Sequence, residues 1–152
     1  MTAPRQTQLQ IIDRLRTLIG KLLESRRVFE QVASTLRHKE LQQSVIGLAQ
    51  ESAQYAGELG SQIRALGGET ERLPGNGSLE VSHEPEDQKW EIREDEKATL
   101  ASCAWKEASI VGAYTELLDE HIPYESLRKM IRYQLQGFLS TFSQLHLLSA
   151  SL

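Results

Sequence analysis

The residues best suited to chemistry are polar side chains that interrupt apolar stretches with helical spacing. Glu107 lies between Ala104 and Val111, at a position where the helical period calls for an apolar residue. Gln134 interrupts a later stretch in the same way, and Ser52 interrupts an earlier one. A buried carboxylate is costly unless it is paired, protonated or bound to a metal. Glu107 therefore predicts either a polar partner or a metal site.

A metal site is the first of two interpretations. Carboxylates from several helices of a ferritin-like bundle can converge on two metal ions, commonly with Glu-x-x-His pairs whose side chains point at the same ions. The chain has one such string, Glu80 to His83, and it lies in an expected connection between helices. The candidate ligands for iron or another divalent metal are Glu30, Glu51, Glu107 and Gln134.

A structural polar layer is the second interpretation, and we favour it. The interruptions lie toward the middle of their stretches, so we expect them to meet at one level of the bundle. Glu107 is then expected to pair with Arg26 or Arg27, or to hydrogen-bond Gln134, and so to set the register of the helices. The predicted layer comprises Arg26, Ser52, Glu107 and Gln134. This interpretation needs no cofactor and predicts a protein that is not an enzyme.

The motifs of other catalytic sites are missing from the sequence. It has no Gly-rich phosphate loop, no Gly-x-Ser-x-Gly turn and no Cys-x-x-Cys pair. We expect the single cysteine, Cys103, to be a small core residue and not a nucleophile.

Four long stretches with apolar residues every three or four positions must position these side chains. They predict helices over residues 7–36, 39–66, 85–120 and 123–150 of a single all-α domain, 1–152. Two-residue links at 37–38 and 121–122 predict two antiparallel hairpins. The connection over 67–84 is long enough to run the length of a helix. We therefore expect a ferritin-like four-helix bundle with up-down-down-up topology.

Composition narrows the classes of partner. The chain has 17 Lys and Arg and 21 Asp and Glu, and the resulting net charge of −4 argues against nucleic-acid binding. No apolar run approaches the roughly 20 residues of a transmembrane helix, and no secretory signal is recognisable. A cytoplasmic protein is therefore expected. Residues 1–37 hold seven basic and three acidic residues. We expect a solvated face there; the alternative is a surface for an anionic partner or a membrane.

The segment 100–123 also resembles a known family. Its Cys103, Glu107 and Tyr114, before an acidic turn that ends in Pro123, are similar to the third-helix signature of a bacterial ferritin-like family of unknown function. Gln134 matches the fourth-helix glutamine of that family. Further matches in the first hairpin are Phe29, Glu30, Leu41, Gln50, Glu51, Tyr55 and the segment 66–69.

The resemblance covers residues 18–145 and implies a ferritin-like bundle with no established activity, of a kind often grouped with bacterial stress or envelope-associated proteins. Members tend to have a histidine where this chain has Phe142, and His83 and Trp90 match a His-Arg-Gly-Trp motif only loosely in spacing. Loss of that imidazole weakens a metal site. We therefore expect a structural or partner-binding bundle with a degenerate metal site, acting as a homodimer or with a protein partner.

Overall fold

The chain folds into four helices. The computed structural model describes residues 5–68, 100 and 104–150, with only the backbone of residues 5 and 6. The helices are α1 (Arg5–Thr35), α2 (Lys39–Ala65), α5 (Ala104–Asp119) and α6 (Glu125–Ala150). The described residues include no strand, which confirms the all-helical prediction. None of the described helices is long and apolar enough to cross a membrane.

The predicted helix ends agree with the structure where the structure describes them. α2 ends as expected at the glycine pair, where Gly67 has φ 89°. The N–H groups of Gly67 and Gly68 donate to the carbonyls of Arg64 (3.0 Å) and Ile63 (2.8 Å), which satisfies the last turn of the helix. Most of the predicted connection 67–84, and the predicted start of the third helix at 85, lie outside the described residues.

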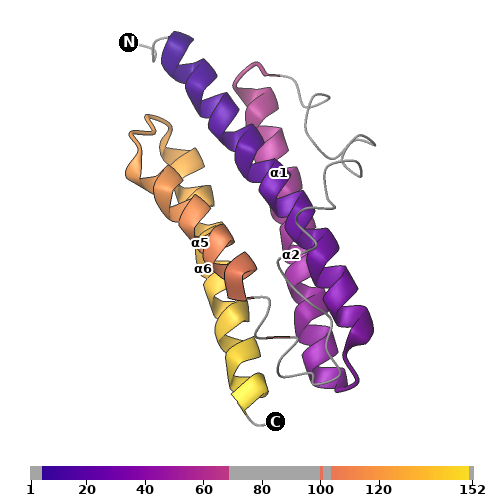
Figure 1. Cartoon of the computed structure of the whole chain (residues 1–152). Helices are drawn as coiled ribbons and strands as arrows, with labels where there is room; N and C mark the ends of the chain where they lie inside the picture. The colour runs from indigo at the N-terminus through magenta and orange to yellow at the C-terminus, as the bar shows by residue number, and fades with distance from the viewer. Residues whose placement is uncertain (1–4, 69–99, 101–103, 151–152) are drawn as a thin grey trace.

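The helices form a ring in which each packs against two neighbours. α1 packs along α2, α2 against α6, α6 against α5, and α5 against α1 (Figure 1). Ion pairs join Arg14 to Glu120 and Glu24 to Lys106, so α1 and α5 are antiparallel. The contacts between α2 and α6, and those within each hairpin, show that these pairs of helices are also antiparallel. It follows that α2 and α5 run in the same direction.

Aromatic side chains from all four helices meet inside the bundle. Phe138 of α6 is central, with its ring centroid 5.1 Å from Tyr55, 5.8 Å from Tyr114 and 6.1 Å from Phe142. Phe29 of α1 packs on Phe142 at 6.3 Å. Such edge-on and stacked pairs add to the stabilisation from buried area, so this cluster is the centre of the core.

The apolar side of α5 is predicted correctly in part. Ile110, Tyr114 and Leu117 are buried as expected, whereas Ala104 is exposed and Glu107 only partly buried. Lys106, on the other side of Ile110, is buried in place of Glu107. The orientation of α5 therefore decides which of its charged side chains enters the bundle.

Gly137 lets α6 approach α2 closely. A Cβ atom at this position would collide with Tyr55 Oη and would lie 3.2 Å from Tyr55 Cζ and 3.3 Å from Glu51 Oε2. The Tyr55 ring is held edge-on against Phe138, at an interplanar angle of 88°, so it has little freedom to move aside.

We therefore expect Gly137→Ala to lower the free energy of unfolding by about 1–3 kcal/mol, although alanine is the better helix former. Gly57→Ala on α2 is the matched control, because a Cβ there meets no atom within 4 Å. The control should stabilise the helix by about 0.5–1 kcal/mol. Urea unfolding of both variants measures the difference, and equal effects would refute the close packing at Gly137.

Candidate functional site

A chain of hydrogen bonds crosses the interior at Gln134. The hydroxyl of Tyr114 donates to Gln134 Oε1 (2.8 Å), and Gln134 Nε2 donates to Glu58 Oε1 (2.9 Å) and approaches the carbonyl of Tyr55 (3.4 Å). Gln134 and Tyr114 are fully buried. The chain of bonds joins α5, α6 and α2, so this buried amide links three helices through the core.

The direction of these bonds follows from the chemistry of the three groups. Burial raises the pKa of Tyr114 far above its ordinary value, with smaller contributions from Tyr55, Glu58 and Glu51, so the phenol stays protonated and can donate a hydrogen bond. The Gln134 oxygen accepts this hydrogen bond, and the NH₂ group of the same side chain donates to the Glu58 carboxylate. One amide thus satisfies a buried donor and a partly buried acceptor.

Glu51 forms a second polar site, between α2 and α6. Tyr55 donates to Glu51 Oε2 (3.2 Å) from one turn further along α2. Burial raises the pKa of Glu51, and the hydroxyls of Thr141 and Tyr55 oppose this effect. A half-buried carboxyl with a raised pKa is a feature that binding sites share.

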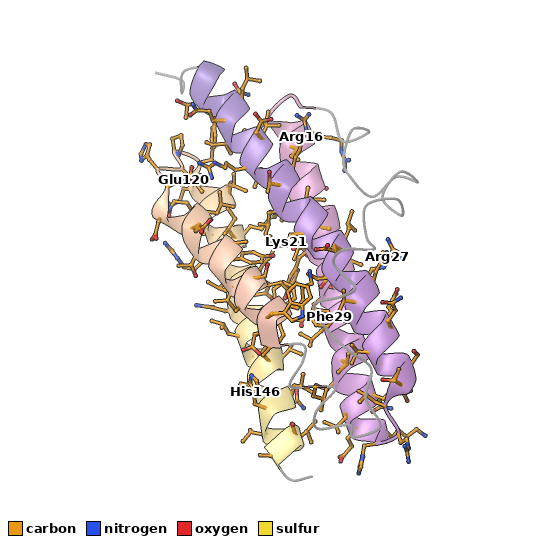
Figure 2. The ribbon with its side chains drawn as sticks, viewed as in Figure 1. Arg16, Lys21, Arg27, Phe29, Glu120 and His146 are labelled. Carbon is orange, nitrogen blue, oxygen red and sulfur yellow. The ribbon has the colours of Figure 1, made fainter. Side chains whose placement is uncertain are left out.

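Glu107 and Arg26 do not pair with each other. Glu107 Oε1 lies 2.9 Å from Nε2 of His146, which is near the C-terminal end of α6 and is labelled in Figure 2. Arg26 pairs instead with Glu30 (3.5 Å) on the exposed side of α1. The predicted contacts of Glu107 with Arg26 and Gln134 are therefore corrected, because Glu107 lies at the edge of the buried side of α5 and faces His146 of α6.

Lys106 is the buried charge of α5 that the sequence analysis missed. Its ammonium lies 2.7 Å from Glu24 Oε1 and 4.4 Å from the ring centroid of Trp105, and the residue is 1% exposed. The spacing of Ile110, Tyr114 and Leu117, extended one turn backwards, falls on Lys106 and was the signal available in the sequence.

Ser52 is buried as expected, but it forms no link between helices. Its hydroxyl donates to the carbonyl of Leu48 in its own helix (2.8 Å), and Ser25 does the same on α1 with Lys21 (2.8 Å). Of the predicted polar layer, the structure thus places Ser52 and Gln134 inside the bundle and Arg26 and Glu107 toward its surface.

The four proposed metal ligands have separate protein partners, although Glu51 and Gln134 both contact Tyr55. Glu30 is held by Arg26, Glu107 by His146, Glu51 by Tyr55 and Gln134 by Tyr114. Within residues 5–68, 100 and 104–150, no three His, Cys, Asp or Glu side chains are grouped so that they could hold an ion. The residues present therefore do not fit a carboxylate-bridged metal pair. Cys103, His83 and Trp90 lie outside the described residues.

Comparison with known proteins does not assign the chain to a family. No protein-family model matches it. A search of curated proteins returns no significant match.

The Tyr114–Gln134 bond can be measured by a double-mutant cycle. Tyr114→Phe leaves Gln134 Oε1 buried without a donor, so we expect a loss of about 1–3 kcal/mol in the free energy of unfolding. In the background of Gln134→Leu the same change should cost at least ~1 kcal/mol less, because the acceptor is gone. Tyr133→Phe, at an exposed tyrosine, is the control. Additive effects of the two core substitutions would contradict the bond.

The raised pKa of Glu51 predicts a pH-dependent effect of Glu51→Gln. Between the ordinary value of 4.5 and the raised value, the folded protein holds a proton that the unfolded chain releases, so this group lowers stability as the pH rises through that interval. The variant should therefore gain stability relative to the wild type from about pH 4 to about pH 7. Urea unfolding at both pH values checks this. Gln50→Ala, at the neighbouring residue, is the control, and its difference in stability from the wild type should be the same at both pH values. If the difference for Glu51→Gln were also the same at both pH values, the prediction would be wrong.

Proposed function

We propose that the protein is a non-catalytic four-helix bundle of the ferritin-like type that acts by binding through its surface. The main support is that each candidate metal ligand is engaged by a protein group: Glu30 by Arg26, Glu107 by His146, and Glu51 and Gln134 by separate groups near Tyr55. Gln134, at the position of the fourth-helix glutamine of that family, is occupied by Tyr114 and Glu58. The shared direction of α2 and α5 supports a long crossover between the hairpins.

The outer side of α6 is the surface that we propose for binding. Residues 133–152 contain no Asp, Glu, Lys or Arg, which is unusual for a helix that water reaches. Tyr133, Leu139 and Leu147 are 68%, 45% and 74% exposed, and at 100° per residue they fall within an arc of about 120°. Interface cores are typically poor in charge and rich in such side chains.

A second copy of the chain is the partner that this surface fits. In a two-fold contact the same face meets itself, so any net charge on the face would repel its own image. From residue 133 onward the α6 face has no Asp, Glu, Lys or Arg and so avoids that repulsion, although the whole chain has a net charge of −4; the exposed Lys129 and Arg132 lie just before it. The remaining exposed side chains on the face, such as Gln136 and Ser143, can form hydrogen bonds in either orientation.

Size-exclusion chromatography with light scattering, combined with metal analysis of the eluted peak after incubation with Fe(II), tests this proposal. We expect a dimer without stoichiometric iron, and a monomer for the double variant Tyr133→Ser/Leu147→Ser. Leu9→Ser, at an exposed leucine of α1, is the control and should remain dimeric. The outer positions are exposed in the single chain, so folding should survive the changes, as circular dichroism would verify.

Two results would contradict the proposal. A wild-type monomer at about 100 μM, well above a typical ~1 μM dissociation constant, would remove the α6 interface. Stoichiometric iron that is lost in Glu107→Ala would support metal chemistry instead.

A further inference from the structure

A polar hollow lies between α2 and α6, away from the Gln134 hydrogen bonds. It has a volume of about 520 Å³ and runs along α2 from Glu40 to Gln54, with Thr141, Gln144 and Leu148 on the α6 side. We call it the α2–α6 groove. Its size is that of a small-molecule site, and polar side chains form most of its wall.

Two buried polar atoms on this wall lack hydrogen-bond partners among the described residues: Glu51 Oε1 and Ser44 Oγ. Tyr55 donates to the other oxygen of Glu51, and the Thr141 hydroxyl, which lies close enough to Glu51 to lower its pKa, donates to the carbonyl of Gly137 (3.1 Å). A buried polar atom without a partner is costly, and native structures rarely leave one unsatisfied. Glu51 Oε1 is thus an unused acceptor on the wall of the groove.

The charge of the lining defines the kind of donor. Among the described residues, Glu40 and Glu51 are its two carboxylates, and no Lys, Arg or His of that part of the chain lines the groove. The other polar groups are glutamine amides and hydroxyls, whose oxygens also accept hydrogen bonds. An anion would meet two carboxylates and no cation, whereas a cation with N–H groups would satisfy the acceptors.

We propose that the α2–α6 groove binds a linear aliphatic amine cation, with one ammonium group donating to Glu51 Oε1 and another near Glu40. The two acids are eleven residues apart on one helix, a separation of about 16 Å along its axis. An extended chain with an ammonium at each end matches this spacing better than a compact cation. The groove adjoins the proposed α6 face at Gln144 and Leu148, but the assignment requires neither the dimer nor any metal.

Calorimetric titration with spermidine at low ionic strength tests the assignment. The wild type should bind one spermidine, and Glu51→Gln should weaken the affinity by about tenfold or more, because the charge-assisted hydrogen bond is lost. Glu30→Gln removes the same charge from the exposed side of α1 and should change the affinity by less than about twofold. Methylammonium, with a single ammonium group, should bind more weakly than spermidine.

Filling the groove gives a second test that does not alter charge. Gly47 lines the groove, and a Cβ there would meet no atom within 4 Å, so Gly47→Leu should enter the open space and abolish spermidine binding without loss of thermal stability. Gly57→Leu is the matched control on α2, where a Cβ also meets no atom within 4 Å, and it should bind like the wild type.

Three results would overturn the proposal. Equal weakening of spermidine binding by Glu51→Gln and Glu30→Gln would indicate charge attraction without a site, and unchanged binding by Gly47→Leu would place the ligand outside the groove. Binding of sorbitol but not of spermidine would indicate a site for a neutral polyol.

Discussion

The interior of the bundle depends on the need to satisfy one buried amide. Gln134 has no access to water, so its oxygen and its NH₂ group must both find partners within the protein. Tyr114 of α5 supplies the donor and Glu58 of α2 the acceptor. These bonds are directional, so they fix the level of α6 against two neighbouring helices, whereas the aromatic rings around Phe138 could pack in several related ways.

Polar contacts also join the first hairpin to the second. Lys106 reaches Glu24, and Lys21 donates to Ser109 (2.9 Å), both between α5 and α1. Small residues such as Ala108 and Gly112 leave a hollow of about 420 Å³ beside these contacts. With fewer large apolar groups at this seam, α1 and α5 are held in register by charge pairing as well as by burial.

Polar groups inside the bundle have a different role from those on its surface. The interior acids and amides are used to hold helices together, while the α2–α6 groove retains acceptors without donors and α6 presents an uncharged face. Chemistry in the bundle centre would require ligands that the structure places at its edges, namely Glu30 and Glu107. Within the described residues, the groove acceptors and the uncharged face, which have no role in holding the helices together, therefore lie on the surface of α2 and α6.

The sequence by itself determined the four helices, their hairpin turns and the glycine that ends α2, because helical periodicity, short links and a left-handed Gly67 are local properties. It also identified Gln134 as a buried polar residue. Only the tertiary structure decided which side chains meet. The structure buries Lys106 against Glu24 and directs Glu107 to His146, and this choice depends on packing between helices distant in the chain, which no local pattern records.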